Sequence, residues 1–385
     1  MTEAASNEND RRGMQSPMSV PRVTTGTAIT GAGVWHPENV LTNEELCVAF
    51  NEFARRANAA GAQPPIKEST PEFIVKASGI KRRYIVDKVG VLDPERMCPN
   101  VADRPDDQLS VQAEFAVNAV TRALAAAGRV GEEVDLVVCG TSMLQRSYPA
   151  IAIEVQNAIG ARGLGFDLTL GCSSATAAIQ VATTAVQAGA ATCAVVVSPE
   201  LMSAHNNWRE RDGHFLFGDA AVALVIERAR PGAWEILSVR AMSKFSSNIR
   251  NNFGFMNRLD PSTQFGADKL FYQQGRRVYK DVIPMAAKYI ASHVEAHGLA
   301  PDQIARYWLH QANQNMNELI AERILGRPAT ASEAPTILDT YGNTASAGAA
   351  IAFTEHNADL AAGSHGLLAA FGAGYSIGSV LMQRS

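Results

Sequence analysis

The sequence has little of several features that mark particular classes of protein. Only five of its 385 residues are cysteine, and no Cys-x-x-Cys pair occurs. This pattern argues against a disulfide framework or a metal site and indicates reduced thiols in a cytoplasmic protein. No window has the apolar length of a membrane span. The net charge of −4 gives no sign of the positively charged surface with which proteins bind nucleic acid.

The first 22 residues also lack an apolar stretch. They contain the polar run Asn-Glu-Asn-Asp-Arg-Arg, so we expect a disordered tail over 1–22 and no secretory signal. The remaining length can bury a large core. We predict two units, 23–230 and 231–385, divided near Pro231 and Gly232.

What the sequence does contain is an alternation of apolar strands and small-residue helices. It predicts helices over 43–60, 71–78, 107–128, 151–159 and 176–190. It predicts strands over 23–34, 134–139, 165–170 and 191–197. Near-continuous apolar strands between helices favour an α/β fold with a buried, largely parallel sheet. The polar segment 248–271 is expected to be an irregular insertion.

A weak internal repeat relates the two predicted units. Residues 217–228 and 371–384 both read Phe-Gly, then a small-residue strand, then a charged end. Residues 134–142 have a similar counterpart in 304–312. Repeats of this kind indicate two similar α/β halves.

Cys172 is the strongest candidate for a catalytic residue. It follows an apolar run and Gly171, and a helix rich in small residues comes after it. A thiol near a helix N-terminus gains stabilisation of its thiolate from the dipole and the free N–H groups. The simpler alternative is a buried structural cysteine, which is how we interpret Cys139 and Cys193 inside apolar strands.

His310 and Asn343 complete a possible constellation. His310 ends an apolar strand, and strand ends of α/β sheets are where ligands bind. Asn343 follows a glycine before a small-residue helix, although Gly-Asn alone is an ordinary turn signal. His205 and His214 lack the third ligand of a metal site. The early Gly31-Ala-Gly33 lacks the last glycine of a dinucleotide fingerprint, so we expect neither metal nor nicotinamide cofactor.

Five dispersed motifs together carry a resemblance. In order, they are DLTLGC at 167–172, FGD at 217–219, HQAN at 310–313, GNT at 342–344 and FGAG at 371–374. The chain from about Val23 onward resembles β-ketoacyl-acyl carrier protein synthase III, a condensing enzyme of the thiolase-like superfamily. The resemblance implies a five-layered αβαβα sandwich, a homodimer, and catalysis by Cys172, His310 and Asn343.

The resemblance also implies a reaction. Cys172 would take an acyl group from an acyl-coenzyme A primer, with the backbone N–H groups of Cys172 and Ala373 as the oxyanion hole. Malonyl-acyl carrier protein would then lose carbon dioxide, and His310 and Asn343 would stabilise the enolate without a metal or other cofactor. The product would be a β-ketoacyl-acyl carrier protein of fatty acid biosynthesis.

Several positions depart from the family pattern or adjust it. Ala373 occupies a position at which the family has glycine. A positive φ at this position would be strained by the alanine side chain. Substrate contacts are expected from Phe73, Phe217, Asn313 and Tyr148, the last closing the partner subunit's acyl pocket. Carrier-protein docking is expected from Arg82, Arg83, Arg276 and Arg277. The long segment 51–70 suggests primers longer than acetyl.

Three other functions remain open at this point. A thiolase-fold relative could transfer the acyl group to an alcohol or amine, or condense chains in secondary metabolism. A papain-type hydrolase also orders Cys, His and Asn, but it would need a secreted context and a Cys-Trp helix start, which Cys172-Ser-Ser lacks. A non-catalytic subunit of a synthase pair would not need the three residues together.

Overall fold

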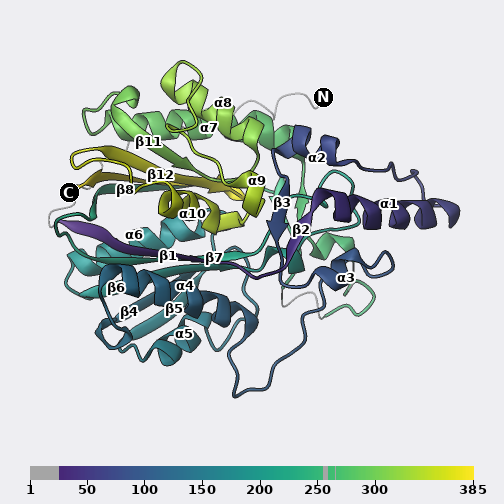
Figure 1. The fold of residues 1–385 in the computed structure, drawn as a ribbon, viewed down its shortest axis with the longest axis horizontal. Coiled ribbons are helices and arrows are strands. Elements are labelled where there is room, and N and C mark those ends of the chain that lie inside the picture. Colours follow the sequence, from purple (N-terminus) through teal and green to yellow (C-terminus); the bar gives the residue numbers. More distant parts are fainter. Residues whose placement is uncertain (1–25, 255–258, 265) are drawn as a thin grey trace, which may run out of the picture.

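A computed structural model of the chain describes residues 26–254, 259–264 and 266–385 (Figure 1). The tail predicted over 1–22 lies outside these residues. A sheet of nine strands forms the frame. In order across it these are β11 (Ile304–Leu309), β12 (His365–Gly372), β13 (Gly374–Arg384), β8 (Trp234–Ser246), β1 (Thr27–Trp35), β7 (Ala220–Arg228), β6 (Cys193–Glu200), β4 (Leu136–Gly140) and β5 (Leu164–Leu168).

The sheet consists of two similar halves. In the first half β4 is parallel to β6, β6 antiparallel to β7, and β7 antiparallel to β1. The second half repeats this pattern with β11, β12, β13 and β8. The halves meet where β1 and β8 pair through Ala28 with Glu235 and Ile29 with Trp234. The sequence repeats therefore fall on strands at equivalent places, β7 with β13 and β4 with β11.

The prediction of a largely parallel sheet is wrong. Only the pairs β4–β5, β4–β6 and β11–β12 are parallel within the nine described strands, and the other ladders are antiparallel. The strands are apolar throughout because helices cover both faces of each half of the sheet. Burial on both faces does not determine whether neighbouring strands are parallel or antiparallel.

Helices form three layers around the two half-sheets. The first half is covered on its outer face by α4 (Val111–Ala127) and α5 (Ile151–Ile159). Between the halves lie α6 (Ser174–Gln187) and α10 (Gly348–Glu355). On the outer face of the second half lie α7 (Gly275–Glu295) and α8 (Gln314–Leu325) (Figure 1). The result is the predicted five-layered sandwich.

Small residues bring the layers close together. A Cβ added at Gly31 would lie 2.3 Å from the carbonyl oxygen of Ala123, and one at Gly33 would lie 2.4 Å from that of Ala119. Strand β1 therefore touches the backbone of α4. The motif Gly31-Ala-Gly33 therefore allows close packing of β1 against α4.

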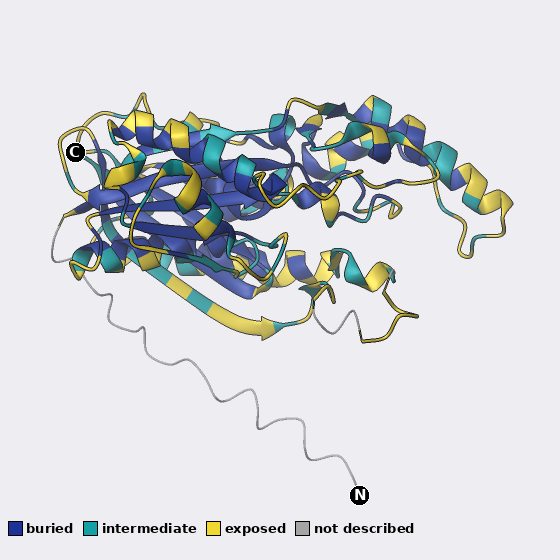
Figure 2. Cartoon of the chain, turned by 90° about the horizontal axis from the view of Figure 1, so that it is seen from below, coloured by how far each residue is buried: buried dark blue, intermediate teal, exposed yellow. Residues whose placement is uncertain are grey.

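A smaller subdomain lies at one end of the sandwich. It contains the helices α1 (Asn43–Ala59), α2 (Pro71–Ser78), α3 (Lys88–Leu92) and α9 (Leu338–Tyr341), and the strands β2 (Val40–Thr42) and β3 (Arg82–Tyr84). The far end of α1 and the second half of β8 are exposed, whereas most of the central strands of the sheet are buried (Figure 2). Helices α1 and α2 match the predicted ranges closely. Near the start of the segment predicted to be irregular, β9 (Ile249–Arg250) pairs with β10 (Tyr272–Gln273), which follows that segment.

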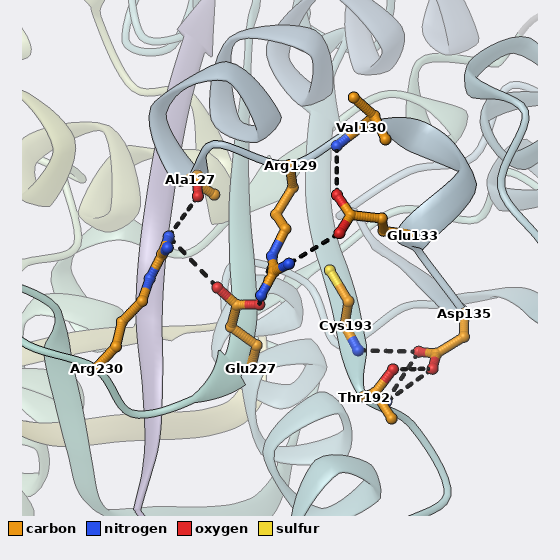
Figure 3. A network of polar contacts seen from close by, with 9 residues as sticks. All are labelled: Ala127, Arg129, Val130, Glu133, Asp135, Thr192, Cys193, Glu227 and Arg230. Carbon is orange, nitrogen blue, oxygen red and sulfur yellow. Dashed lines mark hydrogen bonds and ion pairs between the residues drawn. The ribbon is translucent and has the colours of Figure 1, made fainter.

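A polar network links the end of β7 with the segments that precede β4 and β6 in the first half (Figure 3). Glu227, at the end of β7, is 3% exposed and pairs with Arg129 at 2.8 Å and Arg230 at 3.4 Å. Asp135 accepts hydrogen bonds from the backbone N–H groups of Thr192 and Cys193. The buried carboxylate of Glu227 thus has two cationic partners, and the network joins α4, β6 and β7.

Candidate active site

A cavity of about 180 Å³ brings the three predicted catalytic residues together. Cys172, His310 and Asn343 all line it, although they come from three separate connections of the fold. Its other walls are mainly apolar side chains, among them Phe217, Phe271, Val278, Val282, Met316 and Phe371. A largely apolar pocket with a few polar groups is the usual form of a small-molecule site.

Cys172 lies in a tight turn just before α6. Gly171 has φ +53, a conformation that glycine adopts without strain, and Ser173 is the N-cap residue of the helix. Gly372 presses on the other side, since a Cβ added there would lie 2.9 Å from Sγ of Cys172. The predicted position at a helix N-terminus is thus what the structure has.

The thiol is held in its neutral form by its surroundings. Burial raises the pKa of Cys172 to about 12, and the charge of Glu200 adds to this effect. The backbone N–H groups of Ala373 and Cys172 act in the opposite direction, because they hydrogen-bond to the sulfur. Two backbone N–H groups therefore lie next to the nucleophile, where donors for an oxyanion hole are required.

The strain expected at Ala373 is absent. Among the described residues other than glycine, a positive φ occurs only at Met97 and Ala345. The left-handed region falls instead on the next residue, Gly374, with φ +128. Ala373 can therefore carry a methyl group and still direct its N–H to Cys172.

His310 follows β11 and is 2% exposed. Burial lowers the pKa of its imidazole to about 4, so the ring is neutral at physiological pH. Its Nδ1 has no hydrogen-bond partner among the described residues, and the edge of the ring faces Phe371 at a centroid distance of 5.3 Å. A neutral imidazole can donate one N–H into the cavity.

Asn343 is oriented by its own loop. Its Oδ1 accepts the N–H of Ala345 at 2.9 Å, and its backbone pairs with Leu216 and Gly218. With Oδ1 occupied, the amide Nδ2 is the group left to donate, and it has no partner among the described residues. Both His310 and Asn343 are thus available as donors in the cavity that Cys172 also lines.

Two buried residues that the sequence analysis did not assign support this site. Gln311 donates to the carbonyl of Leu309 and accepts the N–H of Ile337, which fixes the chain next to His310. Glu200 accepts the N–H groups of Ser142 and Ser346, and burial raises its pKa. The only signal in the sequence is that each ends or follows a strand.

The predicted substrate contacts divide into two groups. Phe217 and Asn313 line the cavity, but Asn313 also caps α8 and donates its amide to the carbonyl of Ala77. Phe73 and Tyr148 do not line it within the described part of the chain. The Phe73 ring is covered by the guanidinium of Arg211 at 3.9 Å, and Tyr148 is 84% exposed.

One predicted docking residue is in the wrong place. Arg83 is fully buried, so it cannot meet a carrier protein. Strand β3 places neighbouring side chains on opposite faces, and Arg83 points inward while Arg82 points outward. Arg276 and Arg277 are exposed at the start of α7, beside the cavity-lining Gly275 and Tyr279.

The described residues contain neither a metal-binding cluster nor a membrane-spanning helix. No group of three or more His, Cys, Asp or Glu side chains there could hold a metal ion. No helix there has the length and apolarity needed to cross a bilayer.

Fold and site together define a thiolase-like condensing enzyme. Solved structures agree. The β-ketoacyl-acyl carrier protein synthase III of Aquifex aeolicus superposes with a TM-score of 0.74 at 25% identity, covering 93% of this chain and 100% of its own. The priming β-ketosynthase of the R1128 polyketide pathway has a TM-score of 0.73 at 25% identity, covering 97% and 99%.

Sequence comparisons identify the family. Models of 3-oxoacyl-acyl carrier protein synthase III and of its C-terminal part match residues 166–244 and 294–384. The chain is 49% identical to the β-ketodecanoyl-acyl carrier protein synthase of Pseudomonas aeruginosa, covering 87% of this chain and 99% of that protein. It is 31% identical to the synthase III of Rhodospirillum centenum, covering 93% and 98%. The chain belongs to the β-ketoacyl-acyl carrier protein synthase III family, and it is an acyltransferase of the condensing type.

Proposed function

We propose that this enzyme condenses a medium-chain acyl-coenzyme A with malonyl-acyl carrier protein, and that an eight-carbon acyl group is the preferred primer. The relative from Pseudomonas aeruginosa is named for a β-ketodecanoyl product. A ten-carbon product formed with two carbons from malonate requires a primer of about eight carbons. The apolar walls of the cavity suit such a chain.

In the first half-reaction the sulfur of Cys172 attacks the thioester carbonyl. The tetrahedral intermediate places its negative oxygen toward the N–H groups of Cys172 and Ala373. Collapse of the intermediate expels coenzyme A, whose thiolate takes up a proton, and leaves the acyl group on Cys172. Because the resting thiol has a pKa of about 12, its proton has to leave as the bond forms.

In the second half-reaction malonyl thioester loses carbon dioxide, and the electron pair of the broken C–C bond forms an enolate. His310 and Asn343 donate to the enolate oxygen. The enolate carbon then attacks the acyl carbonyl on Cys172, and the sulfur leaves as thiolate. The observation that carries this proposal is the shared cavity, which Cys172, the neutral imidazole of His310 and the side chain of Asn343 all line.

We further propose the setting of the reaction. The enzyme acts as a homodimer in the cytoplasm, needs no cofactor, and receives the carrier protein at Arg82, Arg276 and Arg277. These three exposed cations suit an acidic partner, and charge complementarity of this kind acts mainly on the encounter rate.

The proposal is tested by intact-mass spectrometry after incubation with acetyl- to dodecanoyl-coenzyme A. We expect one acyl adduct on the wild type, largest for octanoyl, and none on Cys172→Ala, because no other residue is placed to accept the group. An adduct of equal size on Cys172→Ala would remove Cys172 from its role. A profile that peaks at acetyl would contradict the primer length.

A second candidate is a condensing step of secondary metabolism. The structural likeness to the R1128 priming β-ketosynthase favours it. Both candidates predict acylation of Cys172, so the acceptor separates them. Formation of β-ketodecanoyl product with the carrier protein of fatty acid synthesis supports our proposal. Product formed only with a different acceptor supports the alternative.

A further inference from the structure

Arg83 is a buried cation without an anionic partner among the described residues. Its side chain is fully buried, and its guanidinium donates to the carbonyl of Leu41 at 3.3 Å, to Oδ1 of Asn43 at 2.8 Å and to the carbonyl of Phe215 at 3.0 Å. Its Nε has no partner there. Burial lowers the pKa of the guanidinium to about 10, which still leaves it charged at neutral pH. Burying a charge on neutral acceptors is unfavourable, so the arrangement calls for a reason.

The Cβ atom of Arg83 packs closely against the backbone of two glycines. A Cβ added at Gly218 would lie 2.9 Å from Cβ of Arg83, and one at Gly342 would lie 3.2 Å from it. The next residue, Tyr84, accepts the N–H of Asp219 at 2.8 Å. Arg83 therefore fixes two loops at once, the one after Phe215 and the one before Asn343.

These two loops hold each other in register. The N–H of Asn343 donates to the carbonyl of Leu216 at 2.9 Å, and the N–H of Gly218 donates to the carbonyl of Asn343 at 3.1 Å. Phe217, between them, lines the cavity. The position of the Asn343 amide therefore depends on the 215–218 loop, and that loop is bonded to the guanidinium of Arg83.

The turn that carries the nucleophile is built from other parts of the chain. Cys172 is packed by Gly372 and receives N–H groups from its own residue and Ala373. None of the three hydrogen bonds of Arg83 reaches this turn. A change at Arg83 should therefore affect the two half-reactions unequally.

We propose that Arg83 is a positioning residue for the malonyl half-reaction, holding Asn343 and Phe217 in place through its three hydrogen bonds to Leu41, Asn43 and Phe215. This rests on the role of Asn343 in the proposed function. Only a planar guanidinium presents several donors in a fixed fork, so lysine is not an equivalent replacement. A displacement of about 1 Å at a reacting group can reduce a rate by about a hundredfold.

The test compares the two half-reactions in Arg83→Lys. Octanoyl transfer from octanoyl-coenzyme A is followed by intact mass, and carbon dioxide release from malonyl-coenzyme A is followed separately. We expect acylation within about threefold of wild type and decarboxylation reduced by about tenfold to a hundredfold. Lys81→Met is the matched control, because it changes an exposed cation two residues away and should leave both rates unchanged.

Asn343→Ala separates the possible failures. If Asn343→Ala loses decarboxylation and Arg83→Lys does not, the role of Arg83 is overturned while the proposed function stands. If Asn343→Ala decarboxylates at the wild-type rate, the proposed function itself is wrong. Equal loss of both half-reactions in Arg83→Lys would show a general scaffold role and overturn the inference. Should Arg83→Lys not fold, Asn43→Ala removes one acceptor of the same guanidinium, and the same selective loss is expected.

Discussion

At the scale of the single residue, the thiol of Cys172 is held between opposing influences. Burial and the charge of Glu200 favour the neutral thiol, and two backbone N–H groups favour the thiolate. Glu200 itself is fully buried and lies among Ser142 and Ser346. Its effect on the nucleophile can be measured directly.

We expect Glu200→Gln to make Cys172 titrate at lower pH. The thiol ionises at a pH where Glu200 is charged, so removing that charge removes one cause of the raised pKa. Glutamine keeps an oxygen acceptor for the two N–H groups. The measurement is the pH profile of iodoacetamide labelling of Cys172. A midpoint that stays in place or moves upward would mean that the carboxylate does not act on the thiol.

Single residues also mark where sequence reasoning succeeds and where it stops. The positions of Cys172 and His310 in one cavity could be anticipated because each follows a strand of the sheet, whereas Asn343 follows helix α9 and was placed there only through the family resemblance. The burial of Arg83 could not be anticipated from the sequence. In a run of Lys-Arg-Arg the composition looks solvated, and only the alternation of a three-residue strand decides which side chain faces inward.

At the scale of the element, helices were easier to anticipate than strand directions. Helix α2 begins and ends as predicted, because Thr70 caps its start and Gly79 ends it with φ +82. Strand direction depends on which distant segments pair. Nothing local in β7 or β13 encodes that each lies antiparallel to its neighbours, since their side chains are buried on both faces.

The first turn of α7 carries two cations, although positive charge at a helix N-terminus opposes the helix dipole. Arg276→Glu and Arg277→Glu should therefore raise the melting temperature slightly and at the same time raise KM for malonyl-acyl carrier protein. The salt dependence of that KM should weaken, because fewer charges meet the acidic partner. Kinetics with malonyl-coenzyme A serve as the control. Unchanged salt dependence in both variants would place the docking surface elsewhere.

At the scale of the whole molecule, one chain does not account for every predicted substrate contact. Tyr148 is 84% exposed and lies away from the cavity of its own chain. An aromatic side chain so exposed is free to enter the acyl pocket of a second subunit, as the family resemblance implies. The dimer and the entry of Tyr148 into the partner's acyl pocket stay predictions. Substitution of Tyr148 tests the second of them.

We expect Tyr148→Ala to extend the accepted primer by a few methylenes. A side chain at a pocket floor limits chain length by volume, and each buried methylene contributes about 0.8 kcal/mol. The measurement is kcat/KM from acetyl- to dodecanoyl-coenzyme A for both proteins. If the two profiles superimpose, the segment 51–70 becomes the better candidate for control of chain length.

The glycine that presses on the nucleophile has a consequence for drug resistance. A Cβ at Gly372 would lie 2.7 Å from Cβ and 2.9 Å from Sγ of Cys172. Resistance to an inhibitor that reacts with a cysteine commonly requires a bulkier neighbour that blocks the compound and spares the substrate. At this position any side chain displaces the sulfur that both need. We therefore expect a substitution of Gly372 to lower turnover together with reactivity toward such an inhibitor, which disfavours this route of resistance.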